Sequence, residues 1–200
     1  FRETWNDFQF PILGANGLTE IKNANSARID GLESQLNWQA TYNLQLTAGA
    51  ALYHARLSAN YCGFTDANGH PITNCPAGSI NPQDGSVVAG PLAPKGTQLP
   101  ITPRFKGNLI AHYSFSLGSN DAFVQAALVH VGTRTTDLRL TERKLLGDLP
   151  AYNSLDLSAG IQRNSWSVKV YVDNAFDKRA AQYKYTECGV DVCGAHGVVA

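Results

Sequence analysis

Residues 152–172, YNSLDLSAGIQRNSWSVKVYV, alternate apolar and polar side chains on either side of a short turn. The apolar positions are Leu155, Leu157, Ala159 and Ile161 before the turn, and Trp166, Val168, Val170 and Val172 after it. Successive side chains of a β-strand point to opposite faces, so a period of two predicts two strands with one apolar face each. The connection Arg163-Asn164-Ser165 is typical of a hairpin turn. The segment therefore predicts an antiparallel hairpin.

The same period of two recurs upstream of this hairpin. Residues 31–42, 44–52 and 107–117 carry apolar side chains at alternate positions, among them Leu109 and Tyr113. Residues 122–131 are apolar at most positions, which predicts a strand without assigning its two faces. We expect about seven strands and an all-β chain.

Short and long connections between the predicted strands alternate along the chain. The short ones fall near residues 42–43, 118–121 and 163–165, and the long ones span about 61–100, 136–149 and 176–200. This order predicts an antiparallel up-and-down meander with all tight turns at one end. A loop of such length is unusual in a compact soluble domain, whereas outer-membrane barrels combine short periplasmic turns with long external loops.

Composition narrows the classes of function. Charged residues make up 16% of the chain, hydrophobic residues 44%, and the formal net charge is zero. A neutral chain without basic and aromatic residues interleaved does not predict nucleic-acid binding. The sequence contains no run of 18 apolar residues, so a transmembrane helix is not predicted. The absence of Met is expected for a processed product or a piece of a longer polypeptide.

Aromatic residues gather near the predicted tight turns. Trp and Tyr favour the membrane–water interface because their rings are apolar but carry a polar group. We therefore expect an aromatic girdle at that end of a barrel, although each ring taken singly also fits the core of a β-sandwich. The six aromatic residues are Trp38, Tyr42, Tyr113, Phe115, Phe123 and Trp166.

Four cysteines, Cys62, Cys75, Cys188 and Cys193, lie in loop-like sequence. Pairing of nearest neighbours is the simplest of three connectivities and would indicate an oxidising compartment. A metal site is the alternative, because Cys188, Cys193 and His196 are close in sequence, but no second ligand pair stands at a zinc-like spacing.

Three motifs resemble those of one family. YVDNAFDKRA (residues 171–180) resembles a penultimate-strand signature with Asn174, Phe176 and Asp177 at its core. NSARIDGLESQL (residues 25–36) and LPITPRFKGNL (residues 99–109) are similar to an earlier strand and to the re-entry from a long external loop. In this order they resemble the C-terminal part of the β-barrel of TonB-dependent outer-membrane receptors.

The resemblance implies that residues 1–200 are part of a large barrel in the outer membrane of a Gram-negative bacterium. The plug domain, the segment that contacts the TonB energy-coupling complex and the final strand would lie outside the chain. A membrane sheet must close on itself, so the missing strands would come from the same polypeptide. Alternate positions would face lipid: Leu109, Tyr113, Leu155, Leu157, Trp166, Val168, Val170 and Val172.

The implied function is energised uptake of a scarce, bulky nutrient such as a ferric siderophore, cobalamin or an oligosaccharide. Arg104 and Lys106 share the parity of the lumen-facing positions and would contact an anionic ligand, or else be rim charges in water. No catalytic or phosphate-binding motif is present, so we expect neither an enzyme nor a cofactor. The alternatives are a disulfide-stapled β-sandwich binding module at the cell surface or in solution, a small complete pore or adhesin and, most remotely, an enzyme.

Overall fold

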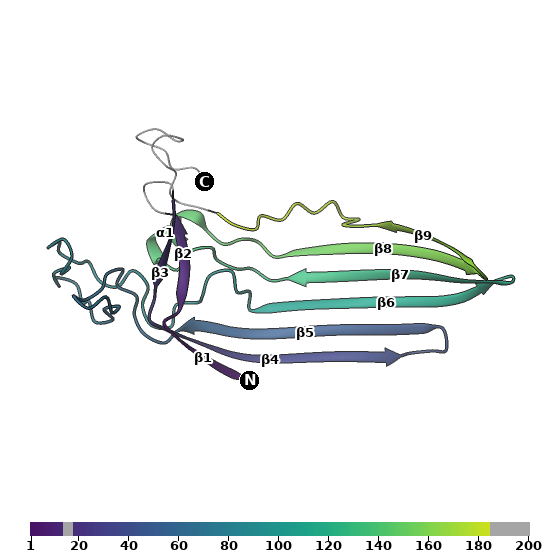
Figure 1. Ribbon diagram of the computed structural model, residues 1–200, viewed down its shortest axis with the longest axis horizontal. Helices are drawn as coiled ribbons and strands as arrows, with labels where there is room; N and C mark the ends of the chain where they lie inside the picture. Colours follow the sequence, from purple (N-terminus) through teal and green to yellow (C-terminus); the bar gives the residue numbers. More distant parts are fainter. Residues whose placement is uncertain (14–17, 185–200) are drawn as a thin grey trace, which may run out of the picture.

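The computed structural model describes residues 1–13 and 18–184. Seven antiparallel strands form one long sheet in the order β1-β4-β5-β6-β7-β8-β9 (Figure 1). The strands are β1 (Arg2–Asn6), β4 (Ser26–Gln39), β5 (Leu44–Leu57), β6 (Phe105–Leu117), β7 (Asn120–Val131), β8 (Tyr152–Arg163) and β9 (Trp166–Val172). From β4 onward each strand pairs with its successor, so the predicted all-β antiparallel meander is confirmed.

Three tight turns join strands at one end of the sheet. Gly118 and Asn164 have φ angles of 64° and 47°, the left-handed conformation that two-residue hairpins require. In the β4–β5 turn, the N–H of Ala40 donates to the carbonyl of Leu44 at 2.9 Å. The side-chain amide of Gln39 donates to the carbonyl of Thr41 at 2.8 Å. Local backbone chemistry therefore sets the register at this end.

Long connections leave the opposite end, where the remaining elements lie (Figure 1). Residues 7–25 include the hairpin of β2 (Gln9–Leu13) and β3 (Thr19–Asn23). Residues 58–104 join β5 to β6, and residues 132–151 contain α1 (Leu140–Leu146). The first two predicted loops are thus longer than expected, and most of the third, residues 185–200, lies outside the described residues. The β2–β3 hairpin and α1 were not predicted.

The buried core lies among these connections and not along the sheet. Phe10, Leu57, Tyr61, Leu99 and Leu138 belong to one buried cluster that joins all three long connections. Along the strands, by contrast, large apolar side chains remain exposed; Leu32 is 66% and Val170 63% accessible. The second sheet, the β2–β3 hairpin, lies at the loop end (Figure 1), where Phe10 joins the buried cluster. In the described residues no sheet covers the length of the long one, so the β-sandwich alternative finds no support.

Candidate functional site

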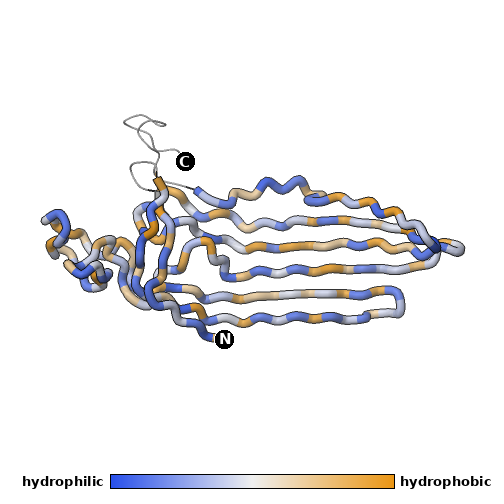
Figure 2. Tube along the Cα trace, in the orientation of Figure 1, coloured by the Kyte–Doolittle hydropathy of each residue, from blue (hydrophilic) through white to orange (hydrophobic). Residues whose placement is uncertain are grey.

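One face of the sheet is apolar across its middle rows because the register matches apolar positions on successive strands. Leu36 pairs with Ala48, Ala48 with Leu109, Leu109 with Leu128 and Leu128 with Leu155. Figure 2 shows the alternation of hydrophobic and hydrophilic residues along the strands. We call this side the apolar face, and it has the chemistry of a surface in contact with hydrocarbon.

All eight residues expected to face lipid lie on the apolar face. Tyr113 pairs with Val124, Val124 with Ala159 and Ala159 with Val170, which places them in one row across four strands. The register also assigns the faces of β7, which sequence alone left open: Ala122, Val124, Ala126 and Leu128 are on the apolar face. Besides Tyr113 and Val170, the residues expected to face lipid are Leu109, Leu155, Leu157, Trp166, Val168 and Val172.

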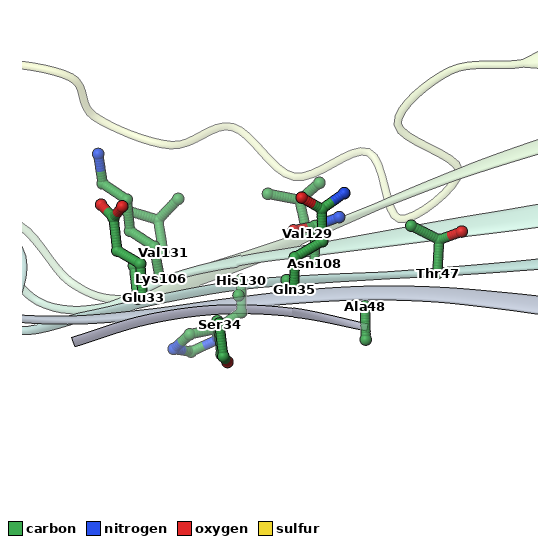
Figure 3. Close-up of a pocket in the computed structure, with 14 residues that line it drawn as sticks. Glu33, Ser34, Gln35, Thr47, Ala48, Lys106, Asn108, Val129, His130 and Val131 are labelled. Carbon is green, nitrogen blue, oxygen red and sulfur yellow. The ribbon is translucent and has the colours of Figure 1, made fainter. Parts of the chain in front are cut away.

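The opposite side carries amide, hydroxyl and charged groups, and we call it the polar face. Figure 3 shows Glu33, Gln35, Lys106 and Asn108 on this side of the sheet, and Ser34 on the other. The hydroxyl of Tyr53 donates to Glu33 Oε1 at 2.6 Å, so neighbouring strands are also linked through side chains. A hollow of about 570 Å³ is lined mainly by residues of this face. It has the chemistry of a water-filled lumen.

Lys106 and Arg104 lie where the polar face meets the loops. Lys106 pairs with Ala51, which pairs with Glu33, so these three residues form one row. The carbonyl of Arg104 accepts a hydrogen bond from Tyr53 N at 2.9 Å. Arg104 also lines a hollow of about 530 Å³ with Tyr53 and Phe1. The structure therefore brings both predicted ligand contacts to the same end of the wall.

One member of the predicted aromatic girdle is on the wrong face. Phe123 pairs with Gly160 on the polar face and stacks on His112, with ring centroids 5.1 Å apart. Proximity to a turn did not determine which face the ring occupies. Trp38, Tyr113, Phe115 and Trp166 do lie on the apolar face, and Tyr42 lies in the β4–β5 turn.

The described parts of the three long connections pack into one body, which we call the loop platform (residues 7–13, 18–25, 58–104 and 132–151). The ring of Phe10 meets that of Tyr61 edge to face, with centroids 5.1 Å apart. The N–H of Leu140 donates to the carbonyl of Leu92 at 2.9 Å. The N–H of Ile101 donates to the carbonyl of Thr135 at 2.7 Å. Contacts across all three connections hold the platform in a defined shape at the loop end of the wall.

Two buried arginines of the platform make side-chain contacts of different kinds. Arg139, 9% accessible, contacts Asp137 at 2.9 Å and Glu142 at 3.1 Å. Arg134, 4% accessible, lies over the ring of Tyr152 with 5.5 Å to its centroid and donates to Gln182 Oε1 at 3.1 Å. These contacts connect residues 132–151 with the segment that follows β9, a link that sequence spacing did not suggest.

The loop from residue 58 to residue 104 is cross-linked at its base. Cys62 and Cys75 form a disulfide. Asn60 accepts from the N–H of Lys95 at 2.8 Å and donates to the carbonyl of Thr73 at 3.0 Å. The other predicted pair, Cys188 and Cys193, lies outside the described residues, as does His196 of the alternative metal site.

Ionisable groups in this loop have shifted pKa values. Burial raises the pKa of Tyr61 to about 12. The backbone N–H of His70 holds the pKa of the Asp66 carboxyl below its usual value. The Ser86 hydroxyl does the same for Asp84. The two carboxylates serve as turn caps, while Tyr61 belongs to the buried core of the platform.

The Asn-x-Phe-Asp motif forms the turn that ends β9. Asn174 has a φ of 51°, its N–H donates to Asp156 Oδ1 at 2.7 Å, and its own Oδ1 accepts from Lys178 N at 3.0 Å. Asp177 N donates to the carbonyl of Asn174 at 2.8 Å. Phe176 is exposed. The motif thus fixes where the chain leaves β9 and holds that point against β8.

Residues 1–175 match the family model described as TonB dependent receptor-like, beta-barrel. The chain belongs to the β-barrel domain of the TonB-dependent receptors, as its motifs suggested. Barrels of this family are receptors and transporters of the Gram-negative outer membrane that enclose a plug and couple to TonB. No curated protein matches the chain.

Two structural findings bear on other classes of site. Among residues 1–13 and 18–184, no helix is long and apolar enough to cross a membrane. In that part of the chain, no group of three or more His, Cys, Asp or Glu side chains is placed to hold a metal ion.

Proposed function

We propose that this chain forms wall and external loops of a receptor for the TonB-energised uptake of a scarce, bulky nutrient across the Gram-negative outer membrane. The nutrient would be a ferric siderophore, cobalamin or an oligosaccharide, and the chain's part is binding and passage, not catalysis. Its partners would be outer-membrane lipid, the rest of the barrel with its plug, and the TonB complex. The family match carries the class of function.

The loop platform supports a role in ligand capture. Three connections share one buried cluster, and the disulfide between Cys62 and Cys75 cross-links the first part of the largest of them. A ligand that meets loops already ordered loses less conformational entropy on binding than one that must order them. The platform lies at the loop end of the polar face, where a nutrient from outside would arrive first.

Arg104 and Lys106 are the proposed contacts for an anionic group of the nutrient. They lie at the loop end of the wall with Tyr53 and Glu33, and guanidinium and ammonium groups attract carboxylates and phosphates. Aromatic Phe1 and Tyr53, with ring centroids 6.3 Å apart, offer an adjoining surface for a bulky ligand. The site therefore combines positive charge with apolar contact area.

A growth experiment identifies the nutrient. A strain that lacks this receptor, complemented with the full-length gene, would be grown on ferric siderophores, cobalamin or oligosaccharides as limiting sources, with and without functional TonB. We expect one class to require both the receptor and TonB. Growth independent of the receptor on every class would contradict the proposal.

The contact residues are tested once the nutrient is known. Binding of that nutrient to purified full-length Arg104→Ala and Lys106→Ala receptors is compared with wild type. Lys169→Ala is the matched control, because Lys169 lies on the polar face near the tight-turn end. We expect weaker binding for the first two variants alone; equal affinities in all four proteins would remove the assignment.

A further inference from the structure

We propose that the loop platform holds a small inorganic anion, chloride in physiological salt, between the guanidinium group of Arg134 and the hydroxyl of Thr136. The ion is a structural part of the platform and not a nutrient, so this inference goes beyond uptake. It depends neither on Arg104 and Lys106 nor on which nutrient is carried.

Buried side-chain atoms without a partner concentrate in one short stretch of the platform. Among the described residues, five buried side-chain nitrogen or oxygen atoms make no hydrogen bond. Three of them belong to consecutive residues, and they are Arg134 Nη1, Thr135 Oγ1 and Thr136 Oγ1. The three residues are 4%, 3% and 2% accessible. Because buried polar groups are nearly always hydrogen-bonded, such a concentration points to an ordered water or ion.

The charge of Arg134 favours an anion over a water molecule. In the part of the chain that the structure describes, no carboxylate forms an ion pair with Arg134. Its guanidinium group lies over the ring of Tyr152, and Nη2 donates to the carbonyl of Ala181 at 3.2 Å and to Gln182 Oε1 at 3.1 Å. These partners are neutral. A positive charge is therefore buried without a counterion, which is unfavourable in a protein interior.

The geometry favours an anion that is monatomic and monovalent. Nη2 of Arg134 is already satisfied, so the two-pronged contact that a carboxylate or phosphate makes with arginine is not offered. The single positive charge of Arg134 is neutralised by one negative charge. Nη1 of Arg134 and Oγ1 of Thr136 are both sealed from solvent, so the ion must also be small. Chloride meets all three conditions.

The backbone places Thr136 on the same side of the chain as Arg134. The N–H of Arg134 donates to the carbonyl of Leu149 at 3.2 Å, and its carbonyl accepts from Leu149 N at 2.8 Å, as in an antiparallel ladder. Side chains two residues apart in an extended chain project to one side, while the residue between them projects to the other. Thr136 thus supplies the second donor, and Thr135 offers a matched control.

The ion completes a junction between the platform and the segment that follows β9. Arg134 contacts residues 181–182 of that segment. Lys184, from the same segment, donates to the carbonyls of Leu146 and Asp148 at the end of α1, at 2.8 and 3.3 Å. Neutralising Arg134 stabilises this junction, because the charge no longer lies buried without a counterion. The order of the platform thereby depends on chloride in the medium outside the cell.

Hydrogen exchange of the full-length receptor in mild detergent tests this dependence. Sodium chloride is titrated against sodium gluconate at constant ionic strength, because gluconate is too large for the site. An ion that binds only the closed platform slows its opening in proportion to the ion's concentration. Once chloride exceeds its Kd, tenfold more chloride should therefore slow exchange of residues 132–151 roughly tenfold.

Three variants assign the effect to the site. Arg134→Met removes the charge and should abolish the dependence on chloride. Thr136→Val removes one donor at nearly constant shape and should require at least roughly tenfold more chloride for the same protection. Thr135→Val removes an equally buried, unpartnered hydroxyl on the other side and should keep the dependence of the wild type. If Arg134→Met fails to fold, the comparison of Thr136→Val with Thr135→Val decides.

Bromide locates the ion directly, because it replaces chloride and scatters X-rays anomalously. Crystals of the full-length receptor grown in sodium bromide should show an anomalous peak in contact with Arg134 Nη1 and Thr136 Oγ1. Equal exchange in chloride and gluconate, or a chloride dependence that persists in Arg134→Met, overturns the proposal. So does a water molecule or a carboxylate found on Nη1 in place of bromide. No nutrient takes part in these measurements, so their failure is distinct from failure of the uptake proposal.

Discussion

The ring of Phe123 occupies the space that a side chain at Gly160 would need. A Cβ at Gly160 would lie 2.9 Å from Phe123 Cζ, closer than carbon atoms approach without displacement. The two residues pair directly across β7 and β8 on the polar face. The same arrangement recurs on that face, where Phe1 covers Gly31 and Asn108 covers Gly49. Glycine in these strands makes room for a neighbour's side chain.

Gly160→Ala is therefore expected to destabilise the full-length receptor. A methyl group at Gly160 would displace the ring from its stacking on His112, at a cost of about 1–3 kcal/mol in free energy of unfolding. Urea titration of the receptor folded in liposomes measures that loss. Ser158→Ala, on the same face, removes an atom instead of adding one and should change stability by less than about 0.5 kcal/mol.

The double variant isolates the contact. Replacing Phe123 with Ala in the Gly160→Ala background removes the clash, so the two losses should be less than additive. Strict additivity would show that Gly160 is required for another reason.

Val170→Arg tests which face meets lipid. Val170 is four residues from Trp166 at the turn, about 10 Å along the membrane normal and so near the middle of an apolar band of about 25 Å. An arginine there should cost about 2–4 kcal/mol, because its charge enters hydrocarbon. Folding yield and urea titration in liposomes provide the measurement.

Tyr171→Arg is the matched control for this prediction. It introduces the same charge at nearly the same depth, but on the polar face next to Lys169. Lys169→Ala should likewise cost little. Equal losses for Val170→Arg and Tyr171→Arg would mean that both faces meet the same environment, and the assignment of faces would be wrong.

The strands were predictable because each face of a barrel wall meets one medium along its whole length. This is why the hydropathy of the side chains has a period of two in β4, β5, β6, β8 and β9. Residues 122–131 lack it, since Phe123, Val129 and Val131 are apolar on the polar face. Their local sequence could not reveal that Phe123 fills the space above a glycine on another strand.

The loop platform was not predictable for a related reason. Its stability comes from contacts between residues far apart in the chain, such as Phe10 with Tyr61 and Leu92 with Leu140. The seven residues of α1 are too few for a helical period to stand out. Gly147, with a φ of 63°, ends this helix. It was a local signal for the helix, together with Glu142 in the first turn and Arg143 and Lys144 in the last turn.

Tyr61 should make the platform sensitive to alkali. Burial raises its pKa in the folded protein to about 12, above the value near 10 of an exposed tyrosine. A raised pKa contributes stability that is complete below pH 10 and is lost as the pH rises from 10 through 12, by about 3 kcal/mol at most. Hydrogen exchange of residues 58–104 against pH reports this opening.

Tyr61→Phe is the control for the alkaline transition. Phenylalanine keeps the edge-to-face contact with Phe10 but cannot ionise, so protection of the loop should persist above pH 10. An alkaline transition identical in the variant and the wild type would assign it to another group.

Asn174 should be replaceable by glycine at lower cost than by alanine. Its φ of 51° is left-handed, and its side chain accepts a hydrogen bond from Lys178 N. Asn174→Gly loses the two side-chain hydrogen bonds, from Lys178 N and to the carbonyl of Lys178, at a cost of about 1 kcal/mol. Asn174→Ala loses them too and also forces a Cβ into the left-handed region, at a further cost of about 1–2 kcal/mol. Thermal unfolding of the full-length receptor in detergent should therefore rank wild type above Gly and Gly above Ala. If Gly and Ala were equally unstable, the hydrogen bonds alone would explain the asparagine, and the left-handed turn would not be what the motif preserves.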